Sequence, residues 1–271
     1  MRRVTHIGLI LCATFIVSTS PADAQYDAQT IIQRSVEANA KDWEAAPSYD
    51  YFERDQQPGG GTKTYEEIMI LGSRYERLVA VNGKPLSADR QAEEQQKLQA
   101  VITQRQNESA RERAERVAQF EKGRRRNRLF MEQLTKAFNF SFLGEQELDG
   151  HDVYVLKATP SSDYQPPNME AEALLGMAGK LWIDKQAFQW VRVEAWVIRP
   201  VSIEGFLAQV EPGTRFELEK SPVEDDIWLP RHFAMKSRAR IFFFFPHKTQ
   251  ADETYYGYHR VTPIQAKPLE K

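Results

Sequence analysis

The sequence has very little cysteine: Cys12 is the one example in 271 residues. It lies inside an apolar run, residues 7–17, that is typical of an N-terminal export signal. Removal of that signal leaves a mature chain without a thiol. Such a chain forms no disulfide, no thiolate metal site and no cysteine nucleophile, so in an oxidising compartment its fold depends on its core alone.

The sequence also lacks the local motifs of common catalytic and cofactor sites. It has five histidines, and no two of them have the spacing of a zinc motif. There is no Gly-x-Ser-x-Gly elbow, no phosphate-binding glycine loop and no convincing local pair of carboxylates. The net charge of −2 argues against attraction to the phosphates of a nucleic acid. We therefore expect no enzymatic activity, no metal, no cofactor and no nucleic-acid partner.

The first 24 residues have the pattern of a secretory signal peptide. Arg2 and Arg3 supply the positive start, the apolar run is too short to span a bilayer, and Ala22 and Ala24 are the small residues that signal peptidase needs. We expect cleavage after Ala24 and a soluble periplasmic protein.

Residues 179–198 predict two β-strands joined by a tight turn. In the first arm Leu181 and Ile183 alternate with other positions, which is the period of two that a strand imposes. In the second arm Val191, Val193 and Val197 share one parity, while aromatic residues dominate the other. A strand that is apolar on both faces needs cover on both sides. The second cover is either protein or a bound apolar ligand.

The rest of the chain predicts an α+β fold that is mostly β. Asp27 opens an amphipathic helix, and Asn82-Gly83 and Asp149-Gly150 are typical hairpin turns between short strands. Roughly ten antiparallel strands are too many for a flat sheet. We therefore expect a curved antiparallel sheet that forms a half-open β-barrel, with an N-terminal helix and a short helix at residues 169–177 that is either a lid or a packed connector.

A long charged segment, at about residues 87–138, predicts helix because it has one glycine and no proline. We expect a mostly solvated helix, broken near Asn107 or Gly123 into a hairpin, with its last turns on the sheet. The segment carries a basic patch, which consists of Lys122, Arg124, Arg125, Arg126 and Arg128. This patch either contacts a membrane surface with anionic head groups or an acidic partner, or is simply a solvated helical face.

These features together resemble the LolA/LolB-like superfamily of periplasmic lipoprotein carriers, with relatives such as RseB. The match is carried by residues 179–194, where Gly-Lys-Leu-Trp-Ile-Asp is followed by a turn and Val-Arg-Val-Glu. Residues 149–156 and 227–230 support it, and the resemblance covers about residues 26–261. It implies a single domain, residues 25–262. The charged segment departs from a minimal carrier of this family, so we expect it to be a helical insertion at about 87–138, and we expect a tail at 263–271. The resemblance also implies an apolar concave face, capped by helices, that shelters acyl chains.

We accordingly expect a carrier of lipid or lipoprotein acyl chains that takes part in outer-membrane lipoprotein sorting and delivers its cargo to an outer-membrane or periplasmic acceptor protein. The alternative is a protein-interaction or envelope-stress-sensing module that uses the charged insertion as its binding surface. The candidates for lining an apolar cavity are Leu174, Leu175, Leu181, Ile183, Val191, Val193, Val197, Phe206, Phe233 and Met235. Each of them could instead only pack against the helices.

Overall fold

The computed structural model describes residues 27–203, 208–224, 226–241 and 245–261. The expected signal peptide, residues 1–24, and the tail, residues 263–271, lie outside the described residues. The helices are α1 (Ala28–Ala45), α2 (Ala88–Gln106), α3 (Ala110–Ala137) and the short α4 (Met169–Glu172), with 3-10 turns η1 (Ala46–Ser48) and η2 (Ala173–Gly176). None of the helices in this part of the chain combines the length and the apolar character that a membrane crossing requires.

The strands form one antiparallel sheet. They are β1 (Tyr49–Gln56), β2 (Thr62–Ile70), β3 (Ser73–Val81), β4 (Lys84–Pro85), β5 (Phe138–Leu148), β6 (His151–Pro160), β7 (Met177–Asp184), β8 (Trp190–Val197), β9 (Val201–Ile203), β10 (Ala208–Val210), β11 (Arg215–Glu224), β12 (Ile227–Ile241) and β13 (Phe245–Arg260). Their order is β4-β3-β2-β1-β13-β12-β11-β8-β7-β6-β5, and β9 and β10 branch off β12.

The sheet is open, because its two edge strands, β4 and β5, do not pair with each other in the described structure. The expected mostly-β fold, a curved antiparallel sheet that does not close into a complete barrel, is confirmed. The pair β7–β8 forms the hairpin predicted at residues 179–198. The first strand, β1, pairs with the last strand, β13. The side chains of both strands therefore lie near the middle of the sheet.

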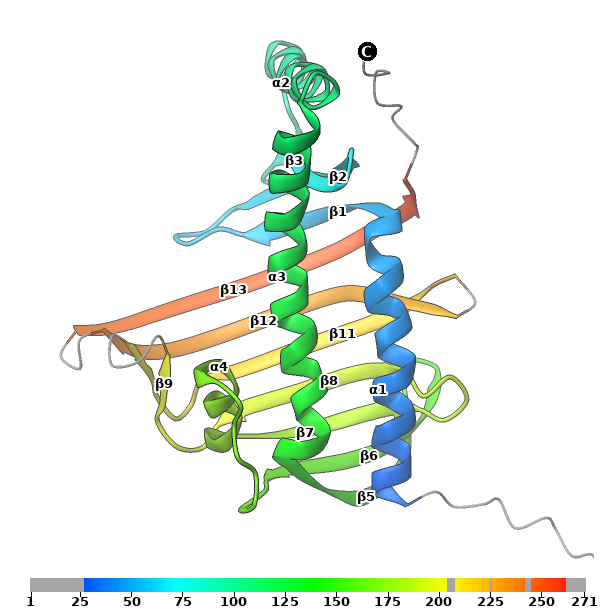
Figure 1. Cartoon of the computed structure of the whole chain (residues 1–271), viewed down its shortest axis with the longest axis vertical. Coiled ribbons are helices and arrows are strands. Elements are labelled where there is room, and N and C mark those ends of the chain that lie inside the picture. The colour runs from blue at the N-terminus through cyan, green and yellow to red at the C-terminus, as the bar shows by residue number, and fades with distance from the viewer. Residues whose placement is uncertain (1–26, 204–207, 225, 242–244, 262–271) are drawn as a thin grey trace, which may run out of the picture.

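Helices α1 and α3 lie on the same face of the sheet, and α3 runs across most of its strands (Figure 1). Asp27 caps α1 by accepting a hydrogen bond of 2.7 Å from the Thr30 N–H, as the sequence predicts. The charged segment breaks at Asn107, after α2, whereas Gly123 lies inside α3. The expected helical hairpin is wrong: α2 is seen end-on beyond the end of α3 rather than alongside it (Figure 1).

The main core lies between α1 and the strands β5 to β8. Ile31 and Ile32 of α1 are completely buried and belong to the same cluster as Leu156, Ile183 and Trp190. The indole N–H of Trp190 donates to Ser35 Oγ of α1 at 3.2 Å. Removing these side chains from water is the main force that holds α1 on the sheet, at about 25 cal/mol per Å² of apolar surface.

A buried ion pair fixes the C-terminal half of α1. Lys220 of β11 pairs with Asp42 and donates to Asn39 Oδ1 at 2.7 Å. Asp42 also accepts the Trp228 N–H at 2.9 Å. Burial raises the pKa of Asp42 and lowers that of Lys220, and the attraction between the two charges opposes both shifts.

The contacts of α3 with the sheet are concentrated at its two ends. Near its N-terminus, Arg116 donates to Ser73 Oγ at 2.8 Å and to the Leu71 carbonyl at 3.2 Å. At its C-terminus, Ala137 is completely buried beside β5 and β6. Between these anchors, α3 crosses the middle strands of the sheet (Figure 1).

Candidate functional site

One row of side chains runs across the helix-facing side of the sheet. Residues directly opposite each other on paired strands share a face, so the row can be followed from strand to strand. From β5 to β12 its members are all apolar: Phe142, Leu156, Leu181, Val193, Leu218 and Phe233. The next two members, on β13 and β1, are Glu253 and Asp55. The row is therefore apolar over one half of the sheet and acidic where β13 meets β1.

From Leu156 onward, the apolar members become less buried along the row. Leu156 is 0% exposed and Leu181 5% exposed, because α1 and η2 cover them. Beyond them, on β8, β11 and β12, a set of five apolar residues on the helix-facing side is only half-buried. We call this set the apolar strip; it consists of Val193, Phe216, Leu218, Phe233 and Met235.

Several of the predicted cavity residues belong to the core rather than to the strip. Leu174, Leu181 and Ile183 are buried in the cluster under α1, and Leu175 packs against that cluster. Leu174 is 1% exposed, and a Cβ on Gly176 would collide with the Val201 side chain and the Arg199 carbonyl. Residues 169–177 are thus a packed connector, which was one of the two alternatives expected from the sequence.

Val191 lies on the opposite face of the sheet from Val193. A bulge shifts the register between Trp182 and Ile183, so that Ile183 faces Trp190 and Val191 is the extra residue. Val191 is buried with Trp182 and Trp228, and protein covers it completely. The expectation that valines at 191 and 193 share a face is wrong, because an extra residue reverses the alternation of a strand.

The remaining predicted cavity residues lie apart. Val197 is buried with Val201 and Val210 in a small separate cluster. Phe206 lies outside the described residues. Phe233 and Met235 are in the apolar strip, together with Val193. The structure therefore brings three of the predicted residues together where they are only half-buried.

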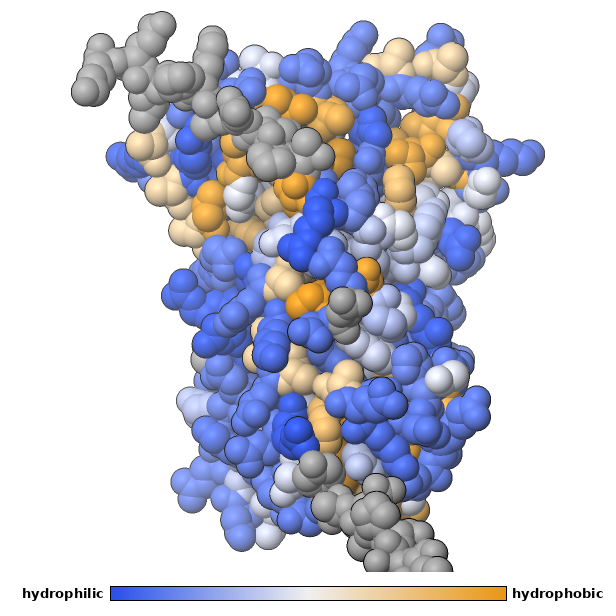
Figure 2. Space-filling model, turned by 90° about the vertical axis from the view of Figure 1, so that its right-hand side faces the viewer, coloured by the Kyte–Doolittle hydropathy of each residue, from blue (hydrophilic) through white to orange (hydrophobic). Residues whose placement is uncertain are grey.

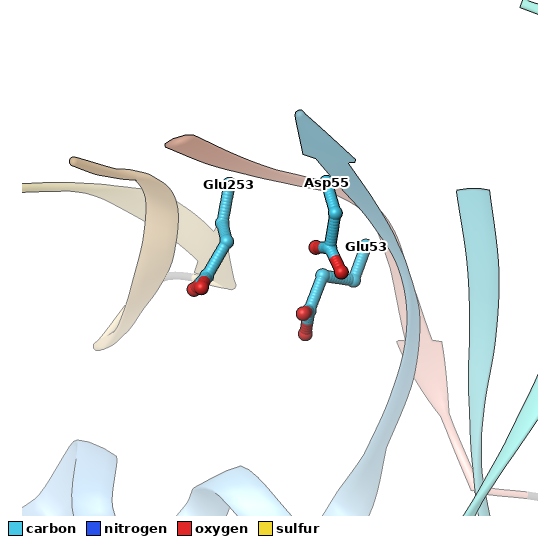
Figure 3. A group of neighbouring side chains, drawn as sticks. All are labelled: Glu53, Asp55 and Glu253. Atoms are coloured by element: carbon cyan, nitrogen blue, oxygen red, sulfur yellow. The ribbon is translucent and has the colours of Figure 1, made fainter. Parts of the chain in front are cut away.

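The acidic half of the row was not found by sequence reasoning. Glu53, Asp55 and Glu253 come from two neighbouring strands and point to the same side of the sheet (Figure 3). One carboxylate oxygen of each lies within 4.8 Å of the others. The spacing of Glu53 and Asp55 on one strand face was the available signal. The third carboxylate could not be placed, because the pairing of β1 with β13 is not visible in the sequence.

The predicted basic patch is only partly a free surface. Arg124 is half-buried, donates to the Trp43 carbonyl at 2.6 Å and pairs with Glu121 at 2.9 Å. Lys122, Arg125 and Arg128 are exposed, and the side chain of Arg126 lies outside the described part of the chain. A surface hollow of about 510 Å³ between α1 and α3 is lined by Trp43, Glu44, Glu121, Arg124, Arg125, Arg128 and Glu132.

The outer surface differs between the two ends of the molecule. In the side view of Figure 2, apolar residues gather at the upper end, which holds β1 to β3 and α2, whereas hydrophilic residues cover most of the lower part. At the β1–β13 pair, Phe52 and Tyr256 stack with ring centroids 5.6 Å apart, and Tyr256 is 44% exposed. The outward side of this strand pair is thus aromatic, whereas its helix-facing side carries the carboxylates together with the packed rings of Tyr51, Tyr255 and Tyr258.

Comparison with known proteins gives a likeness in fold. No family model matches the chain, and no curated protein matches it in sequence. Among solved structures, it is similar to a putative outer membrane lipoprotein-sorting protein domain from Vibrio parahaemolyticus (11% identity, TM-score 0.33, covering 86% of this chain and 95% of that one). It is also similar to a LolA superfamily protein from Nitrosomonas europaea (11% identity, TM-score 0.32, covering 91% and 99%). A third is the MucA/MucB complex of Pseudomonas aeruginosa (10% identity, TM-score 0.26, covering 87% and 99%). The second of these carries the name of the superfamily that the sequence resembles.

Proposed function

We propose that the protein is an exported, non-enzymatic carrier that shelters acyl chains of lipids or lipoproteins against the helix-facing side of its sheet. The observation that carries the proposal is the apolar strip, whose members stay half-buried although α3 crosses the strands that hold them (Figure 1). The core side chains next to them, Leu181 and Ile183, are 5% and 0% exposed. The protein thus leaves apolar surface in a place that its own helices do not fill.

The physical basis of binding is the burial of apolar surface. Each CH₂ group removed from water contributes about 0.8 kcal/mol, so a strip that covers five or six CH₂ groups contributes about 4–5 kcal/mol before the cost of ordering the chain. Such binding needs no catalytic group and depends little on the head group. It suits a carrier that takes up cargo and releases it to an outer-membrane or periplasmic acceptor.

Acyl binding can be tested with the purified chain. Native mass spectrometry after gentle extraction should find lipid bound, and a fluorescent fatty-acyl probe should bind and be displaced by unlabelled fatty acid. Phe233→Ser should weaken the probe affinity several-fold, because it removes one of the two aromatic side chains of the strip. The matched control is Trp196→Ser, which removes an aromatic side chain from the opposite face of the sheet, where Trp196 lies opposite Arg215. A protein that is empty after extraction and does not bind the probe would rule the proposal out.

The second candidate is a protein-interaction or stress-sensing module. It is favoured by the exposed side chains of Lys122, Arg125 and Arg128 beside the hollow between α1 and α3. Deleting the whole insertion is a poor test, because Arg105 and Arg116 tie it to the backbone carbonyls of residues 70–74. Lys122→Glu/Arg125→Glu keeps those contacts. Loss of a co-purified partner with unchanged acyl binding would support the interaction module over the carrier.

A further inference from the structure

The hollow between α1 and α3 carries opposite charges in equal number. It is lined by three glutamates and three arginines together with Trp43, and the charged residues are Glu44, Glu121, Glu132, Arg124, Arg125 and Arg128. Its volume of about 510 Å³ lies in the range of about 300–1,000 Å³ that is typical of small-molecule sites. Because the formal charges cancel, the hollow as a whole does not favour a ligand that is purely anionic.

Four of these six charges are neutralised by pairing within α3. Arg124 pairs with Glu121 at 2.9 Å, and Arg128 pairs with Glu132 at 3.0 Å. The partners are three or four positions apart, so they are neighbours on the helix surface. Arg124 also donates to the Trp43 carbonyl at 2.6 Å, which ties this part of α3 to the C-terminal end of α1. The hollow thus lies between two helices that are joined at this point.

Glu44 and Arg125 line the hollow from different helices, and their charges are not paired. Glu44 lies near the C-terminal end of α1 and Arg125 in the middle of α3, and both side chains are exposed. Within the part of the chain that the structure describes, neither side chain forms an ion pair or a hydrogen bond, with the other or with a third residue. A ligand that carries one positive and one negative group can pair with both residues at once.

The hollow and the apolar strip lie on the same side of the sheet. Helices α1 and α3 both cover the helix-facing side (Figure 1), and the strip belongs to that side. Lys220, which pairs with Asp42 of α1, follows Leu218 of the strip by two positions on β11. A lipid whose acyl chain lies on the strip is therefore next to α1, and the hollow beside this helix is available to its charged head group.

We propose that the hollow binds the head group of a phosphoethanolamine lipid whose acyl chains lie on the apolar strip. This inference rests on the proposed acyl carrier and adds the class of lipid that it prefers. Arg125 donates to the phosphate, for which the planar guanidinium group is well suited, and Glu44 accepts hydrogen bonds from the ammonium group. The acyl chains supply most of the affinity, and the hollow supplies a preference among head groups.

The test compares two short-chain phospholipids that differ only in the head group. Dihexanoyl phosphatidylethanolamine and dihexanoyl phosphatidylglycerol both carry the phosphate, but only the first carries an ammonium group. Each displaces a fluorescent fatty-acyl probe from the purified chain at concentrations below that of micelle formation. The ethanolamine lipid should bind about 2–5-fold more tightly, which is the contribution of one exposed ion pair.

Single variants separate the roles of the two residues. Glu44→Gln should remove the advantage of the ethanolamine lipid and leave the affinity for the glycerol lipid unchanged, because only the ammonium group pairs with Glu44. Arg125→Gln should weaken both lipids about 2–5-fold, because both carry the phosphate. The matched control is Glu37→Gln/Lys41→Gln, which removes one exposed charge of each sign from α1 outside the hollow and should change neither affinity.

The outcomes distinguish this inference from the carrier function on which it rests. If the fatty-acyl probe does not bind, both are wrong. If the probe binds and the two lipids displace it equally well, or the glycerol lipid does so better, only the head-group site is wrong. Persistence of the ethanolamine preference in Glu44→Gln would also overturn the head-group site, because another part of the protein would then recognise the ammonium group.

Discussion

Phe233 lies directly opposite Glu253 on the helix-facing side of the sheet, and the row of side chains changes there from apolar to acidic. On one side of this pair are Leu218 and Val193, and on the other is Asp55. Most strands with one dry face bury apolar residues along the whole of that face. Here the two halves of one face have different chemistry, and only the apolar half suits an acyl chain.

The bulge in β8 allows the two faces to be tested separately. Val193→Ser should weaken binding of an acyl probe several-fold, because Val193 is in the apolar strip. Val191→Ala should lower the free energy of unfolding by about 1–3 kcal/mol and leave the probe affinity unchanged, because Val191 is 1% exposed and packs against Trp228 on the other face. Urea unfolding and probe titration measure the two effects. If Val191→Ala weakens the probe as strongly as Val193→Ser does, the bulge does not separate the faces.

The acidic half of the row should make stability depend on pH. The pKa values of Glu53 and Glu67 are raised to about 8 and about 7, from an ordinary value near 4.5. Between pH 4.5 and pH 8 these two groups therefore hold more protons in the folded state than in the unfolded state. Their contribution to the free energy of unfolding is largest below pH 4.5 and is lost as the pH rises toward 8. The charged groups that face this pair are Asp55, Glu76, Glu253 and Arg74.

This pH effect can be isolated by comparing the protein with Glu53→Gln/Glu67→Gln. Burial also raises the pKa values of Asp42 and Asp50, but both proteins share these groups, so the difference between the two Tm curves reports on the substituted pair. The variant should lose less stability between pH 5 and pH 8. If the Tm curves of the two proteins run parallel between pH 5 and pH 8, the pH dependence does not come from Glu53 and Glu67.

Local signals in the sequence predicted the parts of the fold that depend on a few adjacent residues. Asn82 and Gly83 have φ angles of 52° and 71°, and Asp149 and Gly150 have 53° and 82°, as tight hairpin turns require. Asp27 caps α1 as expected. Each of these depends on backbone freedom or on a hydrogen bond within one turn, so it can be read without knowing the rest of the fold.

The parts that could not be predicted depend on register and on distant pairing. Alternation placed Val191 and Val193 on one face, and a single extra residue in β8 separated them. Glu253 and Asp55 are brought together only by the pairing of the last strand with the first. The sequence predicted which strands are apolar. It could not predict where the helices leave them half-buried, because that depends on how α3 crosses the sheet.

The ion pair of Asp42 and Lys220 should respond differently to single and double substitution. Asp42→Ala should cost about 3–5 kcal/mol, because it leaves Lys220, which is 6% exposed, without its buried partner. Asp42→Leu/Lys220→Met should cost less than the sum of the two single changes, since neither charge then remains in the core. Urea unfolding followed by circular dichroism measures all of these variants. Additive losses would show that the pair is not coupled.

Two glycines should respond in opposite directions to alanine. Gly123 lies inside α3, and a Cβ there meets nothing within 4 Å, so Gly123→Ala should raise the free energy of unfolding by about 0.5–1 kcal/mol through helix propensity. At Gly176 a Cβ would lie 2.9 Å from the Arg199 carbonyl oxygen and would also meet Val201. Gly176→Ala should therefore cost about 1–3 kcal/mol, because the backbone cannot move aside without separating η2 from β9. Thermal unfolding of both variants checks this pair, and a loss of stability in Gly123→Ala would mean that α3 is not a continuous helix at this position.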